Sequence, residues 1–214
     1  MNVLVIGASS GTGREATAAL LKRGHRVTAF ARSADRLPAR DGLTRQKGDA
    51  LVPGDLDAAM PGHDAVVIAL GIHESPLLVR LGFGKTPLNV RSVGTTNVLA
   101  AMKRHGVRRV VVQTTYGIGD SKGRLPFAWA LIFWLLLKPQ IEDSERQEVI
   151  VRASGLDWTL VQPVGLSDVD KGTPVLASPT GETRSMEVSR AQVARFLGEL
   201  VESASSGACL AISA

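Results

Sequence analysis

A glycine-rich turn near the N-terminus carries the clearest chemical signal in the sequence. The apolar residues 3–6 lead into Gly7, and small residues continue to Gly11 and Gly13, where a helical pattern begins. Glycines in such a turn let the backbone approach a phosphate closely, and the N–H groups that open a helix point at the anion. The spacing therefore indicates a site for the pyrophosphate of a dinucleotide, with an ordinary strand-to-helix turn as the alternative interpretation.

An arginine stands where a dinucleotide site distinguishes its two nicotinamide cofactors. The second apolar strand, residues 26–31, ends at Arg32, and Arg36 follows one turn later. An acidic residue at this place favours the ribose hydroxyls of NADH, whereas the planar guanidinium of arginine suits the 2′-phosphate of NADPH. The sequence predicts NADP(H) as the cofactor. The alternative is that both arginines are solvated loop residues.

The composition is typical of one soluble α/β domain. A chain of 214 residues can form one substantial core, and 44% hydrophobic with 21% charged residues argues against disorder. The net charge of +5 is spread along the sequence rather than gathered in a block. An anionic cofactor accounts for part of this excess, and we expect no nucleic-acid partner.

Neither a disulfide framework nor a metal site is expected. Cys209 is the only cysteine, and the four histidines, His25, His63, His73 and His105, have no spacing typical of metal ligands. The first strand begins directly after the N-terminus, which leaves no room for a cleavable signal segment ahead of it. These features together predict a cytoplasmic protein.

Alternating apolar and amphipathic segments predict the elements that position these residues. Buried strands are indicated at residues 3–6, 27–31, 44–47, 65–70, 110–114, 159–161 and 210–212. Helical patterns occur at residues 14–23, 90–105 and 142–154, and a capping box of Ser189 and Gln192 opens the last helix. With right-handed crossovers, this order predicts a doubly wound parallel sheet flanked by helices, within a single domain of residues 1–214.

Acidic residues are concentrated on the predicted helix 142–154. They are Glu142, Asp143, Glu145 and Glu148. A run of charges on a helix is usually a solvated face, and we interpret these carboxylates in that way.

Two segments are expected on the substrate side of the sheet, at about residues 117–140 and 165–187. The second is rich in glycine, proline, serine and threonine and shows no periodicity. The first includes the apolar run 125–137, which is shorter than the roughly 20 residues that cross a bilayer. Such a run must bury its surface, and three interpretations stay open: packing against the core or a second subunit, a wall of an apolar substrate pocket, or contact with a membrane surface.

The sequence resembles the atypical short-chain dehydrogenase/reductase proteins. Besides the N-terminal turn and Arg32, the resemblance rests on residues 48–50, 66–71 and 154–163, and it covers nearly the whole chain. It is strongest to the NAD(P)H-binding group that includes NmrA-like proteins and the flavin/biliverdin reductases, although the glycine spacing of the turn departs from the usual pattern of that group. The resemblance implies a Rossmann-like fold.

The resemblance also implies contacts to each part of the cofactor, all at the carboxyl ends of strands. The implied phosphate contacts are Ser9, Ser10, Gly11, Thr12 and Gly13, with Arg32 and Arg36 at the 2′-phosphate. The implied adenine and ribose contacts are Asp49, Ala50, Ala69, Leu70 and Gly71. The implied nicotinamide contacts are Thr114, Thr115, Tyr116, Pro163 and Val164.

The catalytic pair of many short-chain dehydrogenases is missing. Those enzymes place a lysine four residues after a tyrosine, and the lysine lowers the tyrosine pKa so that the hydroxyl can pass on a proton. Tyr116 is the only tyrosine, and Asp120 stands at the lysine position. Flavins and quinones can take a proton from water, so we assign Thr115 and Tyr116 the orientation of such an acceptor by hydrogen bonds, with packing at a strand end as the alternative.

The leading hypothesis is an NADPH-dependent reductase that transfers hydride to a small, flat, apolar acceptor of the flavin or quinone kind. The main alternative is a non-catalytic NADP(H) sensor of the NmrA-like type, which the missing Tyr/Lys pair favours. A third hypothesis, an assembly or membrane-associated factor, rests only on residues 125–137. The sequence is compatible with a monomer and with a homodimer.

Overall fold

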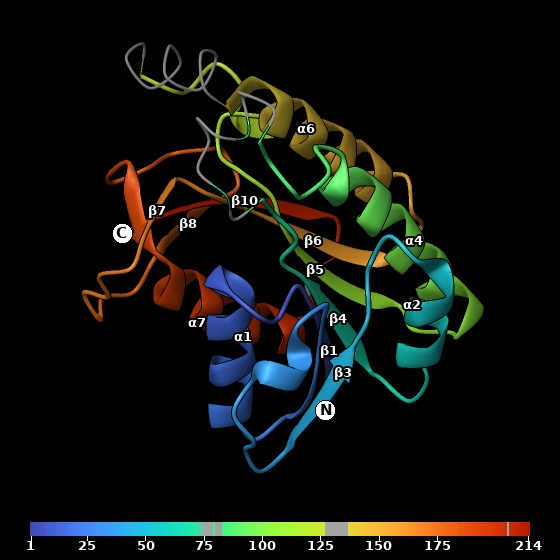
Figure 1. Ribbon diagram of the computed structural model, residues 1–214. Coiled ribbons are helices and arrows are strands. Elements are labelled where there is room, and N and C mark those ends of the chain that lie inside the picture. The colour runs from blue at the N-terminus through green and yellow to red at the C-terminus, as the bar shows by residue number, and fades with distance from the viewer. Residues whose placement is uncertain (73, 75–78, 80–82, 127–136, 205) are drawn as a thin grey trace.

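An eight-stranded sheet forms the centre of the molecule (Figure 1). The computed structural model describes residues 1–214 except 73, 75–78, 80–82, 127–136 and 205. The strands, in sheet order, are β3 (Leu43–Lys47), β2 (Arg26–Ala31), β1 (Asn2–Ile6), β4 (Ala65–Ile68), β5 (Arg109–Gln113), β6 (Asp157–Pro163), β10 (Ala208–Ser213) and β8 (Leu176–Ser178). Neighbouring strands are parallel, except for the antiparallel pair of β10 and β8.

Helices cover both faces of this sheet, which confirms the predicted doubly wound architecture. The helices α1 (Gly11–Lys22) and α7 (Arg190–Glu202) pack together on one face (Figure 1). The helices on the other face are α2 (Pro53–Ala59), α4 (Val90–Arg104) and α6 (Lys138–Arg152). The short 3-10 turns are η1 (Ala34–Arg36) and η2 (Gly119–Ser121). A second small sheet pairs β7 (Gly165–Ser167) with β9 (Glu187–Ser189).

The central strands are apolar on both sides because both faces of the sheet are covered. In β1, Val3 and Val5 belong to the core shared with α1 and α7, whereas Leu4 and Ile6 belong to the core shared with α2 and α4. All four side chains are fully buried. Continuous apolar runs are typical of such strands, and for this reason the sequence alone indicates them.

The winding of the sheet reverses between β1 and β4, and this reversal determines where a ligand can bind. From β1 the chain proceeds outward to β2 and β3, and it then returns to pair β4 with the other side of β1. Loops that leave neighbouring strands at such a reversal run in opposite directions, which opens a crevice at the carboxyl ends of the strands. The loops that follow β1 and β4 border this crevice.

The segment after β6 differs from the expectation. Residues 165–187 contain β7, β8 and the start of β9, although the sequence indicated no regular structure there. Each of these strands has three residues, which is too short for an alternating pattern to be recognised. Helix α6 begins at Lys138, four residues before the expected start, and its first turn contains Pro139, where a proline is tolerated.

The apolar run 125–137 lies mostly outside the described residues, which exclude 127–136. Its three interpretations therefore remain predictions, and the expected substrate-side segment 117–140 is described only in part. Within the part of the chain that the structure describes, no helix has both the length and the apolar character needed to cross a bilayer.

A buried carboxylate fastens α6 to the sheet below the carboxyl ends of β5 and β6. Glu148 accepts hydrogen bonds from Thr114 Oγ1 at 2.7 Å and from Gln162 Nε2 at 2.8 Å. Arg152, one turn later, places its Nη2 atom 3.7 Å from Glu148 Oε2. Burial raises the pKa of Glu148, and the hydrogen bonds and Arg152 oppose this effect without cancelling it.

The interpretation of the acidic residues of α6 as a solvated face is wrong for two of them. Asp143 and Glu148 are 1% and 2% exposed, respectively. Asp143 accepts hydrogen bonds from the start of α4, and Oε1 of Glu148 accepts them from Thr114, just after β5, and from Gln162 in β6. The periodicity of the sequence does not reveal these partners, because they come from segments distant along the chain.

The pH dependence of stability tests this account of Glu148. Because its pKa is raised in the folded state, its contribution to stability is fully present below the ordinary value of 4.5 and is lost as pH rises through the folded-state value. Glu148→Gln keeps an acceptor for Thr114 and Gln162 but cannot ionise. We expect the free energy of unfolding of this variant, relative to the native chain, to increase between about pH 4 and about pH 7 in urea titrations. A constant or decreasing difference would contradict the raised pKa.

Candidate functional site

The turn between β1 and α1 contains backbone contacts that leave no room for a side chain. Gly7 has a φ of +88°, and a Cβ at this position would lie 2.6 Å from the carbonyl oxygen of Ala69. A Cβ at Gly13 would lie 2.2 Å from the carbonyl oxygen of Gly7. Both distances are far below van der Waals contact, so the two glycines allow the start of α1 to fold back closely onto the end of β1.

The first turn of α1 leaves its N–H groups available to a ligand. Ser10 at the N-cap makes no side-chain hydrogen bond to this turn, and the turn contains no acidic residue. The N-terminus of a helix carries partial positive charge and unsatisfied donors. A turn of this shape, closed by glycines and without a side-chain cap on its N–H groups, fits a phosphate group.

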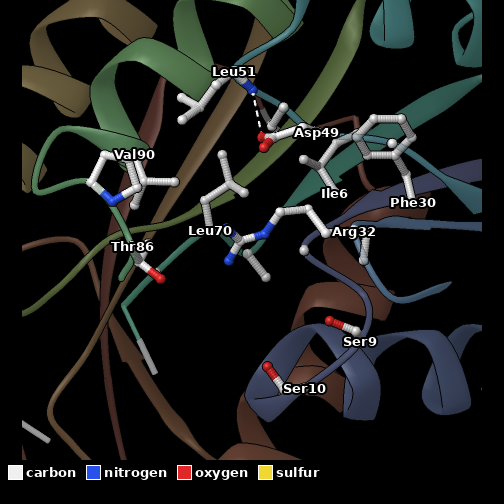
Figure 2. A pocket seen from close by; sticks show the side chains of 17 residues that line it. Ile6, Ser9, Ser10, Phe30, Arg32, Asp49, Leu51, Leu70, Thr86 and Val90 are labelled. Atoms are coloured by element: carbon white, nitrogen blue, oxygen red, sulfur yellow. Dashed lines mark hydrogen bonds between the residues drawn. The ribbon is translucent and has the colours of Figure 1, made fainter. Parts of the chain in front are cut away.

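A cavity of about 120 Å³ lies beside the turn, at the carboxyl ends of β1, β2 and β4. Ser9 and Ser10 border it at the start of α1, and Leu70 lines it from the loop after β4 (Figure 2). Arg32, the residue after β2, extends its side chain into this cavity (Figure 2). Among the described residues, no hydrogen bond or ion pair engages its guanidinium, which is therefore available to an anion.

Asp49 and its neighbours form another part of the wall of this cavity. A carboxylate oxygen of Asp49 accepts a hydrogen bond from the Leu51 N–H group at 3.0 Å (Figure 2). The N–H group of Asp49 donates to the carboxylate of Asp55 at 2.8 Å. These local bonds fix the loop after β3, and Asp49 is held beside the cavity.

Helix α4 supports the cavity through a second close approach. A Cβ at Gly94 would lie 2.6 Å from Cδ1 of Leu70, so the glycine lets α4 pack directly against the loop after β4. One turn later, the side-chain amide of Asn97 donates to the carbonyl oxygen of Ala50 at 3.1 Å. The loops after β3 and β4 are thus joined through one helix.

A second cavity, also of about 120 Å³, continues from the first and shares Ser10 and residues 69–71 with it. Its other lining residues are Gly11, Thr12, Ile72, Arg91, Gln113, Leu166 and Arg190. Nε of Arg190, at the start of α7, lies 3.7 Å from the place of a Cβ on Gly11. The same guanidinium pairs with the exposed Asp168 at 2.7 Å. Together the two cavities form a groove along the carboxyl ends of β2, β1, β4 and β5.

Tyr116 lies at the same edge of the sheet, but its hydroxyl is already engaged. The side chain is 2% exposed, and the hydroxyl donates to the carbonyl oxygen of Gly181 at 2.8 Å. Its N–H group donates to the carbonyl oxygen of Pro163 at 3.0 Å. Tyr116 therefore ties the chain after β5 to β6 and to the segment between β8 and β9.

The structure brings most of the predicted cofactor residues together. The predicted residues that line the groove are Gly7, Ser9, Ser10, Gly11, Thr12, Arg32, Asp49, Ala50, Ala69, Leu70 and Gly71. Gly13 supports the turn from α1. The predicted residues that line neither cavity are Arg36, Thr114, Thr115, Tyr116, Pro163 and Val164. Arg36 is exposed at the end of η1, and the roles of all six remain predictions.

Three polar residues of the second cavity were not anticipated from the sequence. Gln113 is the last residue of β5 and follows three valines, and Arg190 directly follows the N-cap Ser189. In both cases, a polar residue at the end of a strand or helix was the sequence feature that could have indicated a place in the site. Arg91, in the first turn of α4, carries no comparable signal, because its place in the cavity depends on how α4 packs against the loop after β4.

Comparisons with known proteins agree with this architecture. An uncharacterised chloroplastic protein of Arabidopsis thaliana is 25% identical over 206 residues, which represent 92% of this chain and 70% of that protein. A solved short-chain dehydrogenase/reductase from Veillonella parvula in complex with NADP matches with a TM-score of 0.82 and 18% identity, over 100% of this chain and 94% of the other. An anaerobillin reductase from Escherichia coli O157:H7 matches with a TM-score of 0.75 and 20% identity, over 100% and 97% of the two chains.

At these identities, the structural matches establish the fold. The match to a protein family goes further, because it is made on the sequence itself. The family is described as NAD(P)H-binding, and its pattern matches residues 7–204, from the first glycine of the turn to beyond the end of α7. The matched region includes nearly every residue that lines the groove. The chain belongs to the NAD(P)H-binding family.

Proposed function

We propose that the protein is an NADPH-dependent reductase that transfers hydride to a small, flat acceptor of the flavin or quinone kind. The observation that carries the proposal is the guanidinium of Arg32, which extends into the first cavity and has no partner among the described residues. The 2′-phosphate of NADPH offers this guanidinium a multiply charged anion, whereas the ribose of NADH offers only neutral hydroxyls.

In this proposal, the cofactor lies along the groove with its adenosine, pyrophosphate and nicotinamide parts in succession. The adenosine part occupies the first cavity, beside Arg32, Asp49 and Ala50. The pyrophosphate binds the N–H groups that open α1, and Arg190 adds positive charge beside Gly11. The nicotinamide part then points towards the second cavity, at the ends of β4 and β5.

When bound, NADPH supplies a hydride, and the acceptor takes up one proton from water, so that NADPH, a proton and the acceptor give NADP+ and the reduced acceptor. The chain contributes position and an apolar surface, which Leu70, Ile72 and Leu166 provide in the second cavity. Thr115 is half-buried after β5, and we propose that its hydroxyl orients the acceptor. Because the hydroxyl of Tyr116 donates to Gly181, we propose that Tyr116 holds the segment beside the site.

A sensor of NADP(H) without turnover is the second candidate. The specific observation in its favour is the buried hydroxyl of Tyr116, which donates to a backbone carbonyl instead of facing the groove. Asp120 stands where many short-chain dehydrogenases carry a lysine, so the usual proton-donating pair is missing. In this case, the same groove binds the nucleotide and the protein transmits its presence to a partner.

Replacing Arg32 tests the preference for NADPH. Arg32→Ala removes the guanidinium proposed for the 2′-phosphate, and we expect NADPH binding to weaken by about tenfold or more, since a charge-assisted hydrogen bond contributes roughly 1.5–3 kcal/mol. NADH binding should change little. Quenching of tryptophan fluorescence in parallel titrations with the two nucleotides measures both effects.

Arg26→Ala provides the matched control, because Arg26 is exposed at the opposite end of the same strand. This variant should bind NADPH and NADH as the native chain does. If Arg32→Ala weakened the binding of NADPH and of NADH by the same factor, the assignment of Arg32 to the 2′-phosphate would be wrong. Arg36→Ala, measured in the same way, decides whether Arg36 contributes.

Turnover distinguishes the reductase from the sensor. The protein is mixed with NADPH and either flavin mononucleotide or menadione, without oxygen, and the absorbance of reduced nicotinamide is followed. A reductase should oxidise NADPH with at least one of these acceptors, at a rate that falls in Arg32→Ala. Tight NADPH binding with no oxidation in either reaction would favour the sensor.

A further inference from the structure

The proposed cofactor contacts leave one charged residue of the groove without a role. Arg91 lines the second cavity, and its Nη1 atom is buried with no hydrogen-bond partner among the described residues. Its Nη2 atom lies 3.1 Å from the place that a Cβ on Gly71 would occupy, so Gly71 makes room for the guanidinium. A buried charged donor without a partner is costly, and in native proteins such groups usually meet a ligand or a neighbour.

Asp143 acts on Arg91 through its charge, but its oxygens bind other donors. The carboxylate accepts hydrogen bonds from the N–H groups of Arg91 at 2.8 Å and of Ser92 at 3.2 Å, and also from the Ser92 hydroxyl. It thereby caps the N-terminus of α4. Burial lowers the pKa of the Arg91 guanidinium and Asp143 opposes this effect, while arginine side chains stay protonated in proteins.

Gln113 provides a second, independent indication of a ligand. Its side chain is 7% exposed and lines the same cavity as Arg91. Its Oε1 atom is buried and has no hydrogen-bond partner in the part of the chain that the structure describes. Rotation of the amide by half a turn lets the side chain offer a ligand either an N–H donor or a carbonyl acceptor.

The position of these two residues separates them from the phosphates of the cofactor. Arg190 lies beside Gly11 at the start of α1, where the pyrophosphate is proposed to bind. Arg91 lies beside Gly71, after β4, and Gln113 ends the neighbouring β5. Leu166 lines the same cavity and supplies apolar surface. A cation, a neutral polar group and an apolar wall thus meet at the substrate end of the groove.

We propose that Arg91 and Gln113 bind a carboxylate carried by the acceptor, while Leu166 contacts its apolar body. The guanidinium of Arg91 can donate two parallel hydrogen bonds to the two oxygens of a carboxylate. The phosphates of the cofactor are already assigned, in the proposed function, to the N–H groups that open α1 and to Arg32, which leaves a carboxylate of the acceptor as the anion for Arg91. The inference rests on the proposed function, because that function identifies the ligand of this cavity as the hydride acceptor. It narrows the substrate class from flat apolar molecules to flat organic acids.

Benzoate and its neutral isostere benzamide test the site by calorimetric titration, with and without saturating NADP+. We expect the native chain to bind benzoate about tenfold more tightly than benzamide in both conditions, and Arg91→Gln to remove this preference. Gln113→Leu should weaken benzoate binding by several-fold. Lys103→Gln removes an exposed positive charge from the same helix and should keep the preference.

Equal binding of benzoate and benzamide by the native chain, or a preference that persists in Arg91→Gln, overturns the inference. Inorganic phosphate that binds as tightly as benzoate, and only when Arg91 is present, overturns the choice of a carboxylate. A third outcome is that NADP+ does not bind, although the preference for benzoate over benzamide still depends on Arg91. In that case the proposed function is wrong, whereas the carboxylate site at Arg91 is supported. Arg91→Lys keeps the charge and should retain part of the affinity for benzoate, so the test remains decisive if Arg91→Gln does not fold.

Discussion

The contact of Gly13 with Gly7 is the steric constraint on which the whole groove depends. With no Cβ at either position, the start of α1 packs against Gly7, the first residue after β1, and Gly7 packs against the carbonyl of Ala69 after β4. One turn therefore fixes the positions of a strand end, a helix N-terminus and the neighbouring loop relative to each other. Any side chain at these positions would push α1 away and carry its N–H donors out of line with the groove.

Charges around the groove are arranged asymmetrically. Arg32, Arg91 and Arg190 all line it. The carboxylates of Asp49 and Asp143, in contrast, accept hydrogen bonds from backbone N–H groups. Asp168 pairs with Arg190, whereas the guanidinium of Arg32 has no partner among the described residues and stays available to an anion. The net charge of +5 is consistent with this local excess.

The sequence indicated the central strands, the glycine-rich turn and the position of Arg32 at the end of β2, because each depends on residues close together in the chain. Apolar runs reveal strands that are covered on both faces, and the glycines act within a single turn. The polar partners were not predictable in the same way. Glu148 meets Thr114 and Gln162 only when α6 packs on the sheet, and Arg91 enters its cavity only because Gly71 leaves space. The three-residue strands β7, β8 and β9 are too short to produce a pattern.

The carboxylate of Asp143, which caps the N-terminus of α4, limits where a phosphate can bind beside the groove. Among the described residues, the helices α1, α4 and α7 begin beside the groove, and a helix N-terminus attracts a phosphate when its N–H groups are free. The protein fills one of them with its own carboxylate, held by two N–H groups and a hydroxyl. The capping box of Ser189 and Gln192 closes the start of α7, so α1 is the described helix at the groove that begins without a side-chain acceptor. The carboxylate of Asp143 thereby occupies donors that α4 would otherwise offer to a phosphate, and the N–H groups that open α1 remain for an anion.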